Sequence, residues 1–222
     1  MRVQRALQIN RDGSGIYTLT IGFREPTPGN AASLNPAITD AMNAFAVHVE
    51  AKGGASRRFD DQGYAYWTFT RTFSSTKEGD DALQDDPRQF DANATPILFH
   101  DSLRLTSASG PFGVTTFHVT GTISLVDFLG NAQDWRDATE SLTITMPGGI
   151  SAHRGGIHDG DSITYTIGYN QSATVDVTGG APAAGSATPR ALAALLGVLA
   201  LILAALGIRL LRSPARVSSR AA

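Results

Sequence analysis

The sequence predicts an α+β protein: an antiparallel sheet of about seven to eight strands, one main amphipathic helix packed on it, and one transmembrane helix at the C-terminus. Three observations lead to this prediction. Stretches of alternating apolar and polar residues are separated by turns rich in Gly, Asp or Asn. One segment, 36–51, has the apolar spacing of a helix. The last apolar stretch, 191–211, is long enough to cross a membrane.

The predicted strands are connected mainly by hairpins. Residues 2–10 and 16–23 form the first hairpin, because Asp12-Gly13 between them supplies the positive φ that a tight turn requires. Further strands are predicted at 64–73, 97–106, 112–125, 140–146, 163–169 and 173–177, the last two as a hairpin around Asn170-Gln171. This succession is typical of an antiparallel sheet rather than a parallel α/β fold.

Residues 36–51 are expected to form the main helix. Pro36 suits the first helical position, and Gly53-Gly54 is a usual helix end. The apolar residues recur at helical spacing and form one stripe, namely Ile38, Met42, Phe45 and Val49. We therefore expect this helix to cover one face of the sheet, and at most a short second helix after Ser74-Ser75-Thr76.

Residues 191–211 predict a membrane-spanning helix. Ala191 to Ile208 contain no charged residue, Arg209 interrupts the run, and Arg212 ends it. A helix of about 18 to 21 residues is about 27–31 Å long, which matches the hydrocarbon thickness of a bilayer. The alternative is a buried helix of a globular protein, but such a helix normally carries a polar stripe.

The charges predict how the chain is oriented in the membrane. The net charge of −2 divides into −6 for residues 1–190 and +4 for residues 191–222. The four positive charges of the second part belong to Arg209, Arg212, Arg216 and Arg220. Positive residues beside a span favour the cytoplasmic side, so we expect a cytoplasmic C-terminus and an extracytoplasmic domain. This orientation requires an export signal, which we expect upstream of Met1; the alternative is a tail-anchored protein whose domain faces the cytosol.

Four parts follow from these patterns. We expect an α+β extracytoplasmic domain at 1–178, a flexible Gly/Ala/Pro linker at 179–190, the transmembrane helix at 191–211, and a short basic cytoplasmic tail at 212–222.

The composition argues against several classes of function. The chain has no cysteine, which excludes disulfides, thiolate metal sites and a cysteine nucleophile. The acidic domain argues against nucleic acid as a partner. His153 and His158 do not have a known metal-ligand spacing, and Ser14 lies in a predicted hairpin turn rather than a nucleophile elbow. We therefore expect neither catalysis, nor a metal, nor a cofactor.

An aromatic cluster suggests where a ligand would bind. One face of the predicted strand 64–73 and the apolar stripe of helix 36–51 would form the walls of a cleft between helix and sheet. The candidate ligand-binding residues are Met42, Phe45, Trp67, Phe69 and Phe73. The alternative is that these five side chains close a dry core.

The order of the motifs resembles the LppM-type domain of bacterial envelope proteins. The motifs are Asp12-Gly13-Ser14-Gly15 between two strands, helix 36–51, Phe73-Ser74-Ser75, and Met146-Pro147-Gly148-Gly149-Ile150 before the final hairpin, linker and anchor. The resemblance implies an exported, membrane-anchored α+β domain that binds envelope lipid or glycolipid and is not an enzyme. The alternative function is a membrane-tethered structural or protein-interaction ectodomain. Members of this family often carry a lipid-modified cysteine, which this chain does not have.

Overall fold

The computed structural model describes residues 1–24, 36–85, 101–110, 114–125 and 137–182, and Met1–Ala184 cluster as one compact unit. The helices are α1 (Pro36–Ala51) and α2 (Thr76–Leu83). The strands are β1 (Arg2–Ile9), β2 (Gly15–Arg24), β3 (Ala55–Asp61), β4 (Tyr64–Phe73), β5 (Arg104–Ser109), β6 (Val114–Leu125), β7 (Thr139–Thr145), β8 (Ile150–Arg154), β9 (Ile157–Asp159), β10 (Ser162–Gly168) and β11 (Gln171–Pro182).

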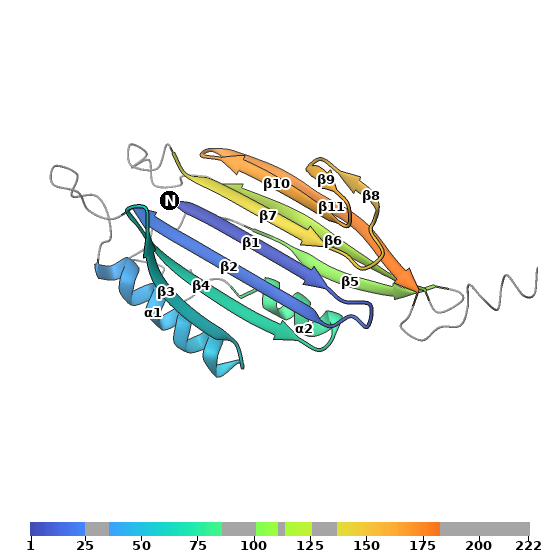
Figure 1. The fold of residues 1–222 in the computed structure, drawn as a ribbon, viewed down its shortest axis with the longest axis horizontal. Helices are drawn as coiled ribbons and strands as arrows, with labels where there is room; N and C mark the ends of the chain where they lie inside the picture. Colours follow the sequence, from blue (N-terminus) through green and yellow to red (C-terminus); the bar gives the residue numbers. More distant parts are fainter. Residues whose placement is uncertain (25–35, 86–100, 111–113, 126–136, 183–222) are drawn as a thin grey trace, which may run out of the picture. The chain divides into compact units, whose positions relative to one another are not determined.

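The strands form two sheets (Figure 1). The first has seven strands in the order β3-β4-β2-β1-β7-β10-β9, and the second has four in the order β5-β6-β11-β8. Every pairing in the two sheets is antiparallel except that of β1 with β7, which is parallel and sets Arg5 opposite Leu142. In the part of the chain that the structure describes, the fold is mostly β with two helices, and the prediction of a single antiparallel sheet of seven to eight strands is wrong.

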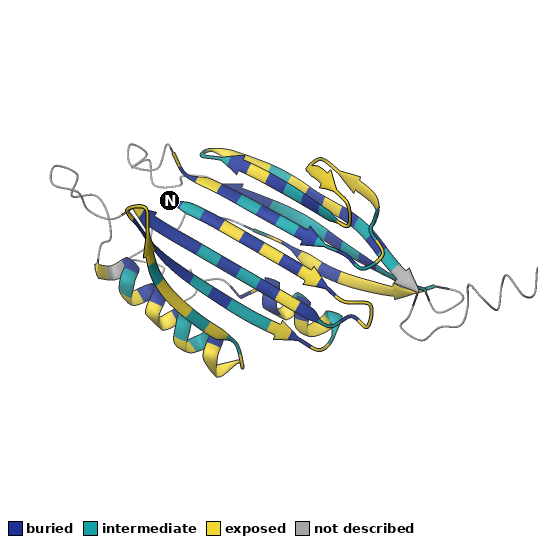
Figure 2. Cartoon of the chain, viewed as in Figure 1, coloured by how far each residue is buried: buried dark blue, intermediate teal, exposed yellow. Residues whose placement is uncertain are grey.

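The inner face of the seven-stranded sheet packs on the helices and on the second sheet. Along β1, every second residue from Val3 to Ile9 is buried, and the residues between them are exposed (Figure 2). The predicted stripe of α1 is also buried and joins one hydrophobic core with the inward side chains of both sheets. The apolar residues that recur with helical spacing in α1 and with strand alternation in the sheets are thus buried in the same core.

The predicted hairpin between 163–169 and 173–177 does not form. β10 belongs to the seven-stranded sheet, whereas β11 pairs with β6 and β8 in the other sheet. At the turn between them Asn170 has a φ of 58°, and its backbone N–H donates to the carbonyl of Leu125 at 2.7 Å. This bond directs the chain onto β6 at the start of β11.

The boundaries of several elements agree with the predicted ones. Helix α1 spans the predicted residues, β4 does as well, and α2 is the short helix that was expected. Ser75 caps α2, because its side chain accepts a hydrogen bond from the backbone N–H of Glu78. Strands β3, β8 and β9 were not predicted, and β11 continues through residues 179–182, where the linker was expected to begin.

Candidate functional site

The five predicted ligand-binding residues all belong to the hydrophobic core, to which α1 and β4 contribute them. All five are buried, with exposed fractions between 0% and 4%: Met42, Phe45, Trp67, Phe69 and Phe73. Phe45 of α1 meets Phe69 of β4 edge to face, with ring centroids 4.6 Å apart and an interplanar angle of 70°. This is a favourable aromatic geometry. The structure thus brings Phe45 and Phe69 into direct contact and buries the other three residues in the same core.

A small cavity lies beside this layer. Its lining consists of Tyr17, Leu19, Phe45, Val49, Phe69, Arg71, Ala82 and Asp85. The volume open to the centre of a water-sized sphere is about 10 Å³, which is close to the space that one water molecule needs. Two of the five predicted residues, Phe45 and Phe69, therefore border a space that is far smaller than an acyl chain.

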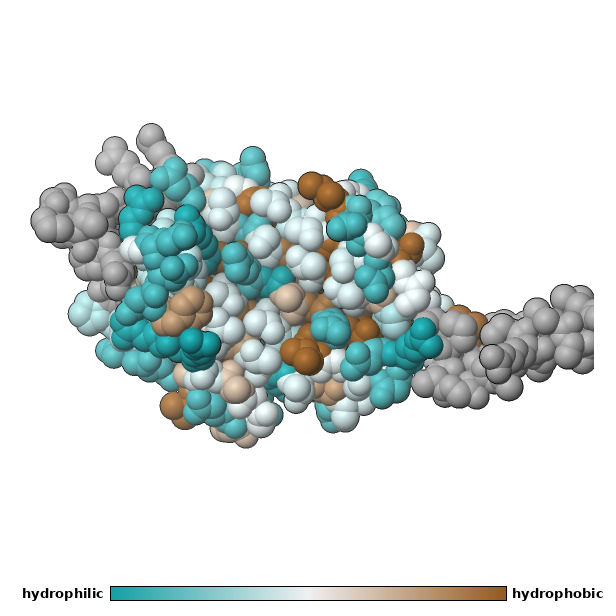
Figure 3. Space-filling view, in the orientation of Figure 1, coloured by the Kyte–Doolittle hydropathy of each residue, from teal (hydrophilic) through white to brown (hydrophobic). Residues whose placement is uncertain are grey.

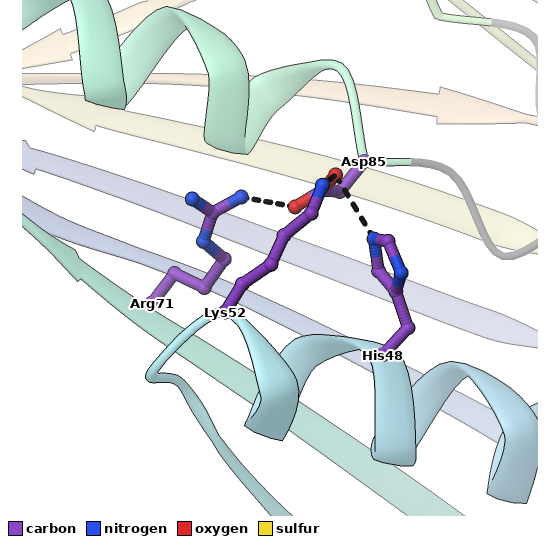
Figure 4. A network of polar contacts seen from close by, with 4 residues as sticks. All are labelled: His48, Lys52, Arg71 and Asp85. Atoms are coloured by element: carbon purple, nitrogen blue, oxygen red, sulfur yellow. Dashed lines mark hydrogen bonds and ion pairs between the residues drawn. The ribbon is translucent and has the colours of Figure 1, made fainter.

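One edge of the cavity is charged (Figure 4). Asp85, after α2, accepts hydrogen bonds from Lys52 Nζ at 2.6 Å and from Arg71 Nη1, and its Oδ1 lies 3.4 Å from His48 Nε2. His48 lies in the last turn of α1, and Lys52 directly follows the helix with its backbone N–H bonded to the His48 carbonyl, so both side chains reach the same carboxylate. We call these four residues the Asp85 cluster. It ties α1, β4 and the end of α2 to one another.

The surroundings of the Asp85 carboxylate favour its charged form. Its side chain is only 8% exposed. Burial by itself would raise the pKa of Asp85, but the hydrogen bond from Lys52 and the positive charges of Arg71 and Lys52 outweigh it and hold this pKa below its usual range. The Asp85 cluster is thus an anion surrounded by cations at the rim of an apolar cavity.

A second charged group is buried deeper under the same sheet. Arg5 of β1 forms ion pairs with Glu140 of β7, Nε to Oε1 at 2.9 Å, and with Asp101, and its Nη1 donates to the hydroxyl of Tyr17 at 3.0 Å. The side chains of Arg5, Asp101 and Glu140 are 3%, 6% and 0% exposed. Asp101 also accepts a hydrogen bond from the backbone N–H of Ser124. We call Arg5, Tyr17, Asp101 and Glu140 the Arg5 cluster.

Glu140 differs from Asp85 in its protonation. Burial raises the pKa of Glu140 to about 8, the charge of Arg5 opposes this, and the neighbouring Asp101 adds to it both by its charge and by a hydrogen bond with the acid. Glu140 therefore holds a proton beside Asp101 at neutral pH. A buried neutral acid is a feature of some catalytic sites, but within the Arg5 cluster it is Tyr17 that lines the cavity. Among the described residues, the acid itself is packed against Arg5 and does not line this cavity.

Sequence reasoning did not identify either cluster, although a signal was present. Arg5 and Glu140 occupy inward positions of alternating strands, as does Arg71 between Phe69 and Phe73. A charged residue at an inward position requires a partner of opposite charge. The identity of the partner depends on tertiary pairing, which the sequence pattern does not give.

The other residues considered from sequence lie on the surface. His153 and His158 are exposed, with rings 5.4 Å apart, and each contacts a nearby backbone carbonyl. Within the described ranges, no three or more His, Cys, Asp or Glu side chains gather into a group that could hold a metal ion. Ser14 lies in the β1–β2 turn and donates to Asp12.

The predicted membrane segment lies outside the described residues, as do Arg209, Arg212, Arg216 and Arg220. In the part of the chain that the structure describes, neither helix has the length and hydrophobicity that a membrane span requires.

Comparison with known proteins gives one distant likeness in structure. No family model and no curated protein matches the chain. It is similar to the folded domain of LppM from Mycobacterium tuberculosis, solved by NMR, with a TM-score of 0.47 and 13% identity over 80% of this chain and 87% of that domain. A likeness at this TM-score and identity carries no argument about function, so membership of the LppM-type family stays a prediction from the sequence motifs.

Proposed function

We propose that this chain is a single-pass membrane protein whose folded domain is a non-catalytic binding module, with lipid or glycolipid as its ligand. The observation that supports the anchor is the apolar run 191–211 with arginines at and after its end. We place the domain on the extracytoplasmic side and the C-terminus in the cytoplasm. The alternative is a tail-anchored protein with the domain in the cytosol.

The lipid hypothesis is supported by the character of the cavity under α1. Apolar side chains of Leu19, Phe45 and Phe69 line it, and the basic Arg71 lies at its edge. Ligand sites typically combine apolar walls with a few polar groups. Because the space accommodates about one water molecule, an acyl chain enters only if α1 moves away from β4.

The orientation can be tested by cysteine labelling, because the chain contains no cysteine of its own. We would introduce Ser109→Cys in the exposed end of β5 and, separately, Ser219→Cys in the tail, and express each from the chromosomal locus. A membrane-impermeant maleimide should label only Ser109→Cys in intact cells and both variants after lysis. The opposite pattern, with Ser219→Cys labelled in intact cells, contradicts the proposed orientation.

The ligand can be tested by native mass spectrometry of the full chain released from membranes in mild detergent. We expect co-purified lipid with the wild type and with Val47→Trp, since Val47 is 67% exposed on α1. Phe45→Trp fills the cavity while keeping it apolar, and should lose the lipid. Circular dichroism establishes that both variants are folded. A lipid-free wild type that also takes up no added lipid contradicts the lipid hypothesis.

A membrane-tethered protein-interaction domain is the second candidate. The observation that favours it is the tight packing of the predicted wall, whose five side chains are almost completely buried. In this case both Trp variants leave function unchanged, and binding depends on an outer surface of the domain.

A further inference from the structure

The outer face of the seven-stranded sheet carries an ordered group of arginine and aromatic side chains near β3. The strand register places Arg2, Gly22, Tyr66 and Phe59 in one row across β1, β2, β4 and β3. Figure 3 shows hydrophilic residues gathered over β3 on this face. Because side chains alternate along a strand, this row points away from the core and from the cavity under α1.

Two of the arginines, Arg2 and Arg24, lie close to the ring of Tyr64. The guanidinium carbon of Arg2 lies 4.3 Å from the ring centroid of Tyr64, and that of Arg24 lies 5.8 Å from it. Arg2 also donates from Nη1 to the hydroxyl of Tyr66 at 3.2 Å. Two guanidinium groups are thus held against one ring, and such stacking fixes their positions.

Tyr66 and Phe59 extend the group to the edge strand. Their rings stack with centroids 5.1 Å apart, and the guanidinium carbon of Arg57 lies 5.5 Å from the Phe59 centroid. Gly22 permits this arrangement, because a β-carbon there would overlap the Tyr66 ring. Tyr64 and Tyr66 are 7% and 8% exposed although they lie on the outer face, so the rings are a rigid support for the arginines.

Among the residues that the structure describes, the neighbouring acidic groups compensate these cations only weakly. Asp137 lies 4.0 Å from Arg24, but the two side chains are 86% and 54% exposed, so their interaction is weak. Asp61 is on the same face, opposite Tyr64. The adjoining Thr20 and Thr68 bond to each other at 2.9 Å. Arg2 and Arg24 carry like charges and both lie close to the Tyr64 ring, so a bound anion would relieve the repulsion between them.

We propose that Arg2, Arg24 and Arg57, positioned by Tyr64, Tyr66 and Phe59, form a binding site for a phosphate group. A planar guanidinium group donates two parallel N–H hydrogen bonds to two oxygens of a phosphate. Several guanidinium groups together suit a phosphate dianion better than they suit a carboxylate, which has one charge and two oxygens. The site lies on the opposite face of the sheet from the cavity under α1, so it does not depend on lipid binding there. The phosphate belongs either to a small soluble phosphate ester or to a lipid headgroup.

Arg57 and Arg58 provide a matched pair of variants. They are adjacent on β3, and each stacks on an aromatic ring, Arg57 on Phe59 and Arg58 on Trp67 at 5.0 Å. The register places Arg57 on the outer face, opposite Thr68, and Arg58 on the other face, opposite Trp67. Arg57→Gln and Arg58→Gln therefore remove the same charge and a similar stacking contact, but only the first touches the proposed site.

The test is a calorimetric titration of the full chain in maltoside micelles with inorganic phosphate, against chloride at the same ionic strength. We expect saturable phosphate binding that Arg24→Gln and Arg57→Gln each weaken about fivefold or more, while Arg58→Gln changes it less than about twofold. Glycerol phosphate, and nanodiscs with or without phosphatidylglycerol, then distinguish a soluble ester from a headgroup as the source.

Two outcomes overturn the proposal. One is the absence of saturable binding to phosphate, to glycerol phosphate and to anionic nanodiscs. The other is an equal loss of binding in Arg57→Gln and Arg58→Gln, which would indicate a diffuse effect of charge. Circular dichroism is recorded for every variant. If Arg24→Gln is unfolded, the comparison of Arg57→Gln with Arg58→Gln decides whether the proposed site binds phosphate.

Discussion

The Asp85 cluster and the Arg5 cluster both place carboxylates under the inner face of the seven-stranded sheet, but they differ in charge ratio and depth. Around Asp85, one carboxylate meets Lys52, Arg71 and His48, and the Lys52 side chain is 42% exposed. Around Arg5, two carboxylates share one guanidinium, and all three side chains are at most 6% exposed. Basic groups outnumber acidic groups in the first cluster, and acidic groups outnumber basic groups in the second.

This difference explains the opposite pKa directions. Burial acts to raise the carboxyl pKa in both clusters, and it is overcome only where cations outnumber the acid. Asp85 stays charged, while Glu140 keeps its proton and thereby avoids a second buried negative charge. The electrostatics of a buried carboxylate are therefore decided by the number of its partners as much as by its depth.

Removing Arg5 should have the largest effect on stability. Arg5→Met leaves Asp101 and Glu140 buried without their cation, so we expect the free energy of unfolding at pH 7 to fall by about 3–5 kcal/mol. Urea denaturation followed by the fluorescence of the buried Trp67 measures it. Arg11→Met, in the exposed β1–β2 turn, should change it by less than about 0.5 kcal/mol. Equal losses in the two variants would contradict a paired Arg5.

Glu140→Gln should change stability in a way that depends on pH. The folded pKa of Glu140, about 8, lies above its ordinary value of 4.5, so its stabilising contribution is complete below about pH 4.5 and is lost as the pH rises through 8. The wild type should lose about 2–4 kcal/mol of stability from this group between pH 5 and pH 9. The variant should not show this loss, and should be the more stable of the two at pH 9.

Melting curves at half-unit pH intervals test this prediction. The useful quantity is the difference between the melting temperatures of Glu140→Gln and the wild type, since other titrating groups cancel in it. A difference that is constant from pH 5 to pH 9 would show that Glu140 is not protonated in the folded protein.

Several helices and strands could be predicted because the spacing of apolar residues within each segment indicates its secondary structure. Helix α1 was identified from the spacing of four apolar residues, and β4 from its aromatic alternation, since in both cases burial of one face imposes the period. Strand β3, with the sequence ASRRFDD, is an edge strand with mostly exposed side chains. Such a strand has no apolar alternation, so the sequence pattern could not reveal it.

The pairing between strands was harder to predict from the sequence than the strands themselves. The hairpin expected between β10 and β11 is replaced by pairing of β11 with β6, which is 46 positions away at the Gln171–Leu125 contact. The parallel pair β1–β7 joins residues more than 130 positions apart. The Arg5 cluster depends on the distant β1–β7 pairing, and the Asp85 cluster joins residues up to 37 positions apart. The sequence therefore predicted which apolar residues are buried but not the charged groups beside them.

The smallest predicted effect concerns Asp85. Because its folded pKa is lowered, its stabilising contribution is present above its ordinary pKa of 3.8 and is lost as the pH falls below that value. Asp85→Asn should therefore reduce the free energy of unfolding by about 1–2 kcal/mol at pH 7, a modest amount because Lys52 is partly hydrated. The loss should be smaller at pH 3 than at pH 7. Asp81→Asn, at an exposed position of α2, is the control and should have little effect at either pH. A loss in Asp85→Asn that is as large at pH 3 as at pH 7 would mean that packing, rather than the charge of the carboxylate, holds α2 against α1 and β4.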